Sequence, residues 1–340
     1  MERFKRIVFT KTNTAEYLDC GEIDVENIGE NQVAVKSYFT TVSAGTERAN
    51  ITASQNTATA SGELFPRYLG YNCAGEVVAV GAKVTRVKVG DKVVVYWSTH
   101  SNYNIVDEAQ VEKFDDTKVS FEDAAVSFIS TFPLAAIRKV KLEIGESLMV
   151  MGLGILGQLA VKLARVAGAC PIIACDPVKE RREEALRNGA DYAFDPLEKD
   201  FAKQVRSVAD GGVKTAIEVT GVGAGLDETL DCMAEFGRVA LLGCTRSSDF
   251  SIDYYNKVHF PGITLVGAHT HARAKQESSH GNYTHNDDIK AVLKLCANGR
   301  LTLKDIVKAT YEPKDCGGVY TRLVNDRNFP VGVQFDWRKE

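Results

Sequence analysis

The segment from residue 147 to residue 176 constrains the fold of this chain more than any other. It begins with a short apolar run, Leu148–Met151, which is typical of a buried strand. A G-x-G-x-x-G pattern follows at Gly152, Gly154 and Gly157. Apolar residues then recur at three- and four-residue spacing until Gly168, a pattern that predicts a helix with a glycine stop. A second apolar run, 171–175, leads into Asp176, so the segment predicts a strand–helix–strand unit of a parallel sheet.

Each part of this segment suits a dinucleotide. The first glycine permits a tight turn, the second lets the backbone approach a pyrophosphate, and the third lets the helix pack closely on the strand. The start of the helix adds N–H groups and a positive dipole. Asp176 lies nineteen residues after Gly157, where an acid accepts hydrogen bonds from a ribose 2′-hydroxyl and repels a 2′-phosphate. We therefore expect a site for NAD, rather than NADP or a bare packing turn, with contacts at Gly152, Gly154, Ile155, Leu156 and Gly157.

The composition describes a globular chain of about two domains. The chain has 340 residues, of which 44% are hydrophobic and 25% are charged. Its net charge of −4 gives no sign of the basic surface that binds nucleic acid or anionic membranes. No apolar run approaches the roughly 20 residues of a membrane span, and the first residues lack the apolar core of a signal peptide. Eight scattered cysteines contain no C-x-x-C pair, so we expect reduced thiols in a cytoplasmic protein without nucleic-acid or membrane partners.

The chain contains two regions with different sequence patterns. Up to residue 110, β-branched runs alternate with glycine and aspartate turns, and the expected strands are Arg6–Phe9, Glu22–Val25, Gln32–Tyr38, Gly75–Val80 and Lys92–Tyr96. Residues 50–66 are small and polar, and we expect a loop there. A capped helix start at Ser120 then opens a region in which strands and helices alternate.

The alternating region predicts a doubly wound parallel sheet with crossover helices. Its expected strands are Leu148–Met151, Ile172–Cys175, Tyr192–Phe194, Thr215–Val219, Arg238–Leu242 and Ile263–Val266, with helices near 155–168, 179–189, 198–209, 223–235 and 253–260. After residue 270, two helices (286–297, 314–324) and two strands (306–310, 331–335) are expected to rejoin the β-rich part. The predicted domains are therefore 1–120 with 270–340, and 121–269.

This order of domains is similar to that of the medium-chain dehydrogenase/reductase family. Two motifs of the first domain carry the likeness, GEVVAVG at 75–81 and VGDKV at 89–93. The glycine loop, IEVTG at 217–221 and VALLG at 239–243 extend it through the second domain. The resemblance implies a GroES-like catalytic domain, a Rossmann domain and a homo-oligomer (a dimer or tetramer). It also implies cofactor contacts at Thr131, Arg181, Thr220, Gly221, Leu242, Gly243 and His269.

The best-known members of this family hold a catalytic zinc, but the matching positions here carry other residues. Ala44, in Ala-Gly-Thr-Glu, stands at the position of a cysteine ligand, and Tyr71, in Gly-Tyr-Asn, at that of a histidine. Counting back from Gly152 places the third ligand at Ser127. Alanine cannot ligate zinc, and neutral tyrosine and serine are poor ligands. The family's four-cysteine lobe is also missing, so we predict no metal. The pattern resembles a zinc-less branch that includes bacteriochlorophyllide dehydrogenase and proteins linked to sugar metabolism.

Without zinc, side chains must take the proton of a substrate hydroxyl or hold the developing oxyanion. Thr46 matches a hydroxyl that contacts the substrate oxygen in the zinc enzymes, although the histidine that often ends that relay is replaced by Ala49. We expect Tyr71 or His100, together with Thr46, to handle the proton. The alternatives are a Tyr71 that only fills the vacated space and a His100 that is structural. Glu47 is expected either to pair within the structure or to act at the substrate.

Four histidines, His269, His271, His280 and His285, lie within seventeen residues, a density that can indicate a metal site. The first two follow the last strand of the cofactor domain, where the family brings a loop against the nicotinamide. We therefore prefer a substrate-facing loop to a metal site. Expected substrate contacts are Glu47, Asn72 and His271, because sites rich in hydrogen-bonding groups reject apolar ligands.

Three functions remain open at this point. The first is an NAD-dependent oxidoreductase acting on a secondary alcohol or ketone of a sugar, polyol or related hydroxylated small-molecule substrate. The second is a carbon–carbon double-bond reductase of the quinone or enoyl type, against which Asp176 argues because those enzymes mostly use NADPH. The third is a non-catalytic cofactor-binding protein, since a fold does not determine a function.

Overall fold

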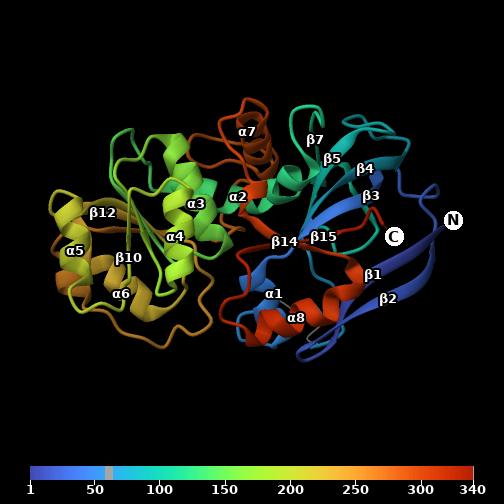
Figure 1. Ribbon diagram of the computed structural model, residues 1–340. Helices are drawn as coiled ribbons and strands as arrows, with labels where there is room; N and C mark the ends of the chain where they lie inside the picture. Colours follow the sequence, from blue (N-terminus) through green and yellow to red (C-terminus); the bar gives the residue numbers. More distant parts are fainter. Residues whose placement is uncertain (58–63, 340) are drawn as a thin grey trace. The chain divides into compact units, whose positions relative to one another are not determined.

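The computed structural model describes residues 1–57 and 64–339 and contains two compact units (Figure 1). The β-rich unit comprises Met1–Ile129 and Ile289–Glu340, and the Rossmann unit comprises Ser130–Asp288. Within the described residues, no helix combines the length and the apolar character that crossing a membrane requires.

Six parallel strands form the sheet of the Rossmann unit, in the order β10-β9-β8-β11-β12-β13. They are β8 (Leu148–Met151), β9 (Ile172–Cys175), β10 (Tyr192–Phe194), β11 (Val213–Glu218), β12 (Met233–Leu241) and β13 (Thr264–Gly267). The predicted doubly wound sheet is confirmed. The strand order reverses between β8 and β11, so their carboxyl ends mark the switch point at which such sheets bind ligands.

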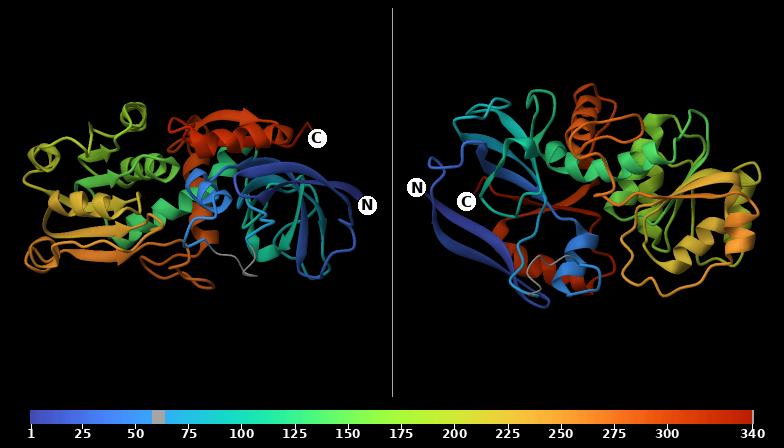
Figure 2. Two further views of the ribbon diagram at one scale, coloured as in Figure 1. Left: turned by 90° about the horizontal axis from the view of Figure 1, so that it is seen from below. Right: turned by 180° about the vertical axis from the view of Figure 1, so that it is seen from behind.

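Helices join these strands and cover both faces of the sheet (Figure 2). They are α3 (Ile155–Ala167), α4 (Lys179–Arg187), α5 (Phe201–Val208), α6 (Gly223–Asp231) and the short π-helix η2 (Tyr255–His259). The helix expected over 223–235 ends at Asp231, because β12 begins already at Met233. The pairing of β12 with β11 jumps from Met233 to Arg238, and Phe236 has a φ of 58° in this irregular stretch.

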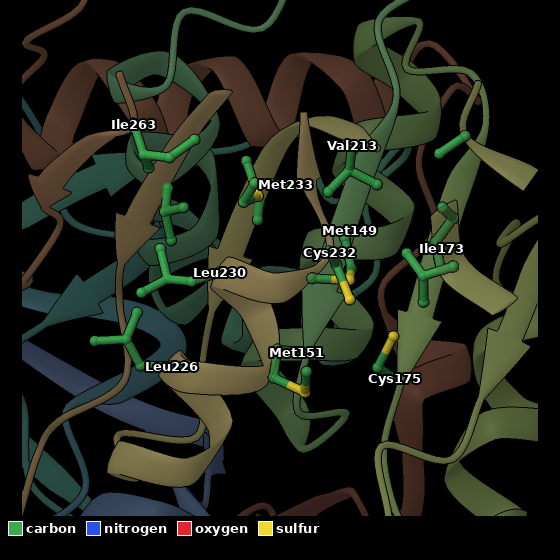
Figure 3. Close-up of a cluster of buried hydrophobic side chains, with 14 of the residues drawn as sticks. Met149, Met151, Ile173, Cys175, Val213, Leu226, Leu230, Cys232, Met233 and Ile263 are labelled. Carbon is green, nitrogen blue, oxygen red and sulfur yellow. The ribbon is translucent and has the colours of Figure 1, made fainter. Parts of the chain in front are cut away.

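One core of the Rossmann unit lies between the sheet and its helices (Figure 3). Met149 and Met151 are alternate residues of β8, so they point to the same face of the sheet, and both are almost completely buried. Leu226 and Leu230 are four residues apart on α6 and pack into the same cluster. Each such side chain contributes about 1.5–3 kcal/mol through burial, which keeps the strand ends that carry the cofactor loop in place.

The β-rich unit contains a hairpin and a seven-stranded sheet. The hairpin pairs β1 (Glu2–Lys11) with β2 (Thr14–Ile23). The sheet has the order β14-β15-β3-β4-β5-β7, with β6 paired to β3. Its strands are β3 (Gln32–Thr41), β4 (Asn72–Val80), β5 (Lys92–Tyr96), β6 (Tyr103–Asp107), β7 (Val111–Lys113), β14 (Val307–Tyr311) and β15 (Gly332–Asp336). Because β15 pairs with β3, the end of the chain completes a sheet that its beginning started.

Four α-helices lie wholly or partly in this unit: α1 (Ala44–Ile51), α2 (Phe121–Lys139), α7 (His285–Ala297) and α8 (Cys316–Asn325). Short 3₁₀ helices are η1 (Glu108–Gln110), η3 (Lys304–Ile306) and η4 (Pro313–Asp315). Helix α1 was not expected, and its last two residues occupy the start of the loop expected over 50–66. Residues 58–63 of that loop lie outside the described residues.

The strand expected at Glu22–Val25 is wrong, because β2 ends at Ile23. Strands β6 and β7 were also missed. In β2 most side chains are polar or partly exposed, so the hydrophobic alternation that marks a half-buried strand is weak. Asn13, with a φ of 59°, forms the tight turn of the hairpin, a conformation that asparagine tolerates better than most residues.

The two units divide the chain at Ile129 and Asp288, whereas the predicted domains divide it at 120 and 269. The first half of α2 is tied to the β-rich unit, since Asp123 accepts a 2.7 Å hydrogen bond from the Leu303 N–H. The segment after β13 is tied to the Rossmann unit, since Arg273 donates to the Thr131 carbonyl oxygen at 2.8 Å. Long-range hydrogen bonds of this kind leave no mark on local composition.

Candidate active site

The glycine loop of the Rossmann unit has the backbone that its spacing predicts. Gly152 has a φ of 97°, which residues with a Cβ rarely adopt. A Cβ on Gly157 would lie 1.9 Å from the Gly152 carbonyl oxygen, whereas a Cβ on Gly154 would meet no atom within 4 Å. The turn and the helix packing therefore require the first and third glycines. The second leaves open space in which a pyrophosphate can approach the backbone.

Helix α3 begins directly at this loop. Its N-cap is Gly154, and no side chain of the described residues caps its first turn. Ile155 is buried and Leu156 is partly buried, so their side chains anchor the turn while its N–H groups suit an anion.

Asp176 is the acid expected to select the ribose. It follows β9 and is 4% exposed. One carboxylate oxygen accepts the Leu153 N–H at 2.8 Å, and the other accepts the Val178 N–H at 2.8 Å. The Arg181 guanidinium lies 3.7 Å from the carboxylate, and the neighbouring Arg182 pairs with Asp195 at 3.1 Å. The carboxylate is thus held against the glycine loop, as a ribose-binding acid requires.

Glu218, at the end of β11, organises the neighbouring loop. The residue is 3% exposed, and burial raises the pKa of its carboxyl group. Its Oε1 accepts the Thr220 N–H at 2.7 Å and also the Thr220 hydroxyl, and both carboxylate oxygens accept the Gly221 N–H. This role was missed, although an acid inside an apolar run was the visible signal.

The loops after β11 and β12 pack closely. The N–H groups of Leu242 and Gly243 donate to the Glu218 carbonyl oxygen at 2.9 and 2.8 Å. A Cβ on Gly243 would lie 2.3 Å from the Gly221 nitrogen, so glycine is needed at this crossing. The expected cofactor residues Thr220, Gly221, Leu242 and Gly243 therefore form one surface at the carboxyl ends of adjacent strands.

The four histidines of this segment differ in their surroundings. His269 and His271 are exposed after β13, with ring centroids 5.3 Å apart. His280 is exposed in a turn. His285 Nδ1 lies 3.3 Å from the Thr131 hydroxyl, and burial lowers the pKa of His285 to about 3. In the described part of the chain, no three His, Cys, Asp or Glu side chains are grouped so that they could hold a metal ion.

Thr131, the other expected nicotinamide contact, is completely buried on α2. Its carbonyl oxygen accepts from Arg273, which also pairs with Asp288 at 3.3 Å. Asp288 is itself buried, and a second guanidinium, that of Arg138, lies 3.0 Å from it. Thr131 thus lies in a tightly bonded part of the Rossmann unit.

In the β-rich unit, three hydroxyl groups meet next to Ala44, and one of them belongs to Tyr71, which matches a metal-ligand position of the zinc enzymes that the chain resembles. Tyr71 donates a short hydrogen bond to the Ser43 hydroxyl, and the Thr46 hydroxyl lies 3.5 Å from the Tyr71 oxygen. The Tyr71 ring makes edge contacts with Trp97 and Phe128 at centroid distances of 5.6 and 5.8 Å. Tyr71 and Thr46 are partly exposed, whereas Ser43 is buried. The Tyr71 oxygen can donate or accept a proton, and the contacts of its ring with Trp97 and Phe128 hold it in place.

The expected metal positions do not offer a ligand set. Ala44 has no donor atom, and Ser127 is completely buried with its hydroxyl donated to the Ala124 carbonyl oxygen at 2.7 Å. Tyr71 is engaged with Ser43. These residues do not fit a zinc ion, which prefers thiolate, imidazole and carboxylate.

His100 and Glu47 lie in the interior, beneath the hydroxyl cluster, with exposures of 1% and 0%. The His100 Nε2 is 3.3 Å from both Glu47 carboxylate oxygens. Glu47 also accepts the Ser43 N–H at 2.8 Å and the Tyr320 hydroxyl at 2.5 Å. This network favours the structural alternative for both residues, and a catalytic His100 and a substrate-binding Glu47 stay untested expectations.

Asn72 is also completely buried, and its amide donates to the Thr41 carbonyl oxygen at 3.3 Å. The expected substrate contact is thus replaced by a contact within the sheet. Ser43 and Tyr320 were not expected in this network. Ser43 stands next to the Ala-Gly-Thr-Glu motif, which was a usable signal, whereas Tyr320 lies 273 residues from Glu47.

Comparison with family models matches residues 29–120 to the alcohol dehydrogenase GroES-like domain and residues 156–280 to a zinc-binding dehydrogenase domain. Among curated proteins, the chain is 30% identical to L-threonine 3-dehydrogenase of Pyrococcus abyssi, over 77% of this chain and 82% of that protein. It is 24% identical to D-guloside 3-dehydrogenase of Escherichia coli, over 78% and 77% of the two chains.

A solved structure supports the fold. The structure of 2R,3R-butanediol dehydrogenase from Bacillus subtilis matches with a TM-score of 0.81 and 23% identity, covering 98% of this chain and 99% of that one. At this identity the likeness concerns the fold alone. The fold, the glycine loop and the sequence relatives all indicate a dehydrogenase of this fold.

Proposed function

We propose that this chain, which belongs to the medium-chain dehydrogenase/reductase family of zinc-type alcohol dehydrogenase-like enzymes that act on CH–OH groups, works without zinc. The proposed reaction transfers hydride between NAD(H) and a secondary alcohol or ketone of a sugar, polyol or related hydroxylated compound. The names of the guloside and threonine relatives support a hydroxylated, polar substrate.

The hydroxyl cluster of Tyr71, Ser43 and Thr46 carries this proposal. By the resemblance, Tyr71 matches a metal-ligand position of the zinc enzymes, and the three hydroxyl groups are poor substitutes for thiolate and imidazole ligands. A tyrosine with two neighbouring hydroxyls can instead hydrogen-bond the substrate oxygen and exchange a proton with it.

In the direction of ketone reduction, Tyr71 would give its proton to the carbonyl oxygen of the substrate. NADH supplies the hydride when bound. The Tyr71 oxygen, now negatively charged, is stabilised by the Ser43 and Thr46 hydroxyls, which can turn to donate to it. Alcohol oxidation reverses each step, so that Tyr71 accepts the hydroxyl proton. The aromatic contacts of Tyr71 keep its oxygen beside both hydroxyls during the transfer.

Asp176 supports NAD as the cofactor, because its carboxylate lies at the glycine loop and would repel a 2′-phosphate. Substituting Asp176→Asn removes that charge while keeping the shape. We expect the preference for NAD over NADP to fall by about tenfold, the effect of roughly 1.4 kcal/mol, as measured by the dissociation constants of both reduced cofactors. An unchanged ratio would place the selectivity elsewhere.

The decisive experiment combines metal analysis with an activity panel. Purified protein should carry no stoichiometric transition metal and should oxidise or reduce a polyol or keto-sugar in the presence of a chelator. Stoichiometric zinc, together with loss of turnover on its removal, would overturn the zinc-free mechanism. NAD binding without turnover of any alcohol, ketone or enone would favour a non-catalytic protein.

A further inference from the structure

We propose that His100 and Glu47 form a positioning pair, which fixes the distance between the hydroxyl oxygens of Tyr71 and Ser43. The inference rests on the proposed function, in which Tyr71 exchanges a proton with the substrate. It gives two buried residues a role in that reaction that acts through Tyr71 and needs no contact with the substrate. All the residues that carry it belong to the β-rich unit.

Glu47 holds the Ser43 end of this hydrogen bond. Ser43 is the N-cap of α1, and Glu47 reaches back along the helix so that its Oε1 accepts the Ser43 N–H at 2.8 Å. A carboxylate in this position fixes the entry of the chain into the helix, as in a capping box. The Ser43 hydroxyl accepts from Tyr71, so a shift of the Glu47 carboxylate would release the backbone that carries this hydroxyl.

His100 holds the Tyr71 end. The preceding residue, Gly70, has a φ of 99°, and a Cβ there would lie 2.4 Å from carbon atoms of the His100 ring. The His100 N–H donates to the Leu69 carbonyl oxygen at 2.7 Å, and the Trp97 N–H donates to the Tyr71 carbonyl oxygen at 3.1 Å. The imidazole therefore lies against the backbone directly before Tyr71, and its place determines where the tyrosine side chain begins.

The orientation of the imidazole is fixed from its other side. The Trp337 Nε1–H donates to the Thr40 hydroxyl oxygen at 2.9 Å, and this oxygen lies 2.7 Å from the His100 Nδ1. An indole nitrogen can only donate. Thr40 is completely buried, and the described residues offer its hydroxyl proton no acceptor besides Nδ1. A neutral His100 then carries its proton on Nε2, which is 3.3 Å from both Glu47 oxygens.

The Glu47 carboxylate thus faces three donors: the Ser43 N–H, the His100 Nε2–H and the Tyr320 hydroxyl at 2.5 Å. A buried carboxylate with several donors is held in one place, because each lost bond would leave a buried group unpaired. One pair of side chains therefore connects the backbone before Tyr71 with that of Ser43. Since a misplacement of about 1 Å can lower a rate by about 100-fold, the pair should affect kcat more than binding.

A double-mutant cycle tests the pair, with the polyol or keto-sugar that gives the highest turnover in the activity panel. His100→Asn is too short to reach Glu47, and we expect it to lower kcat about tenfold with an unchanged dissociation constant for NADH. In a Tyr71→Phe background the same change should lower kcat less than about twofold, because no tyrosine hydroxyl is left to position. His100→Gln, whose amide can reach Glu47, should recover most of the wild-type kcat.

Tyr320→Phe repeats the cycle with a smaller change, since only the hydroxyl that donates to Glu47 is lost. Urea denaturation shows that each variant is folded before its kcat is compared. His259→Gln, at an exposed position of η2, is the control and should change nothing.

Equal losses of kcat with and without the Tyr71 hydroxyl would overturn the positioning role and assign the pair to folding alone. The proposed function would then still stand, because the comparison of Tyr71→Phe with the wild type tests it separately. Wild-type kcat in both His100→Asn and Tyr320→Phe would likewise overturn the positioning role.

Discussion

The glycine loop and the hydroxyl cluster have opposite relations to the family pattern. At the loop, Gly152, Gly154 and Gly157 keep the spacing and the backbone that a dinucleotide requires. At the positions that match metal ligands of the family, Ala44 and Tyr71 stand instead, and the Tyr71 hydroxyl lies beside those of Ser43 and Thr46. A backbone turn leaves no alternative to glycine, whereas several side chains can stabilise a developing oxyanion. The comparison teaches that the glycine loop tolerates fewer residue types than the hydroxyl cluster does.

The largest expected effect tests the constraint at the loop. Gly157→Ala places a Cβ 1.9 Å from the Gly152 carbonyl oxygen, so the loop must shift. We expect a loss of about 3 kcal/mol in the free energy of unfolding and no measurable NAD binding. Urea denaturation and NADH fluorescence measure the two effects.

Gly154→Ala is the matched control, because a Cβ there meets no atom within 4 Å. Its stability should stay within about 0.5 kcal/mol of the wild type, while NAD binds about tenfold more weakly because the methyl group occupies the approach of the pyrophosphate. Equal behaviour of the two variants would break the assignment of separate roles to the glycines.

The next largest effect tests the hydroxyl cluster. Tyr71→Phe keeps the ring contacts with Trp97 and Phe128 but removes the proton donor. We expect kcat to fall by about 100-fold or more, the usual contribution of a general acid, with an unchanged dissociation constant for NADH. Tyr192→Phe, at an exposed position of β10, serves as the control. Near wild-type turnover of Tyr71→Phe on the true substrate would remove Tyr71 from the chemistry.

Glu47→Gln tests whether the buried network supports the hydroxyl cluster. The carboxylate accepts from the Ser43 N–H and from Tyr320, so an amide NH₂ would face a donor. We expect a loss of about 2 kcal/mol in the free energy of unfolding and a smaller loss in kcat. The exposed Glu183→Gln should alter neither. If Glu47→Gln lowers kcat more than Tyr71→Phe does, Glu47 takes part in the reaction more directly than its burial implies.

The smallest effect concerns His285 over the first pH unit below 6.5, where it amounts to about 1.4 kcal/mol. Its folded pKa is lowered to about 3 from 6.5 by burial, followed by the charges of Arg273 and His271. The unfolded chain therefore binds more protons below pH 6.5, and the folded state loses stability as the pH falls from 6.5 toward 3. His285→Gln should flatten this loss by up to about 1.4 kcal/mol for each pH unit. Parallel urea titrations that show the same pH slope for both proteins would contradict the assignment.

Prediction from sequence succeeded best where structure is local. The strands of the Rossmann sheet are continuous apolar runs because both faces are covered, and five of the six, β8 to β11 and β13, were expected within two residues of their bounds. In the β-rich unit, β2 and β7 are short or polar, and their pairing partners rather than their own composition make them strands. The cofactor loop was similarly visible, while Ser43 and Tyr320 were not.

The amino-acid sequence by itself determined the glycine turn, the alternation of strands and helices in the Rossmann unit and the absence of metal-ligand residue types at the family's positions, because these depend on residue identity and spacing. Only the tertiary structure decided which polar residues are accessible. Glu47 belongs to the same motif as Thr46, yet Glu47 and His100 are buried, whereas Thr46 and Tyr71 are partly exposed. Burial depends on segments that fold over a residue from elsewhere, such as α8 with Tyr320 over Glu47. No local sequence pattern predicts that contact.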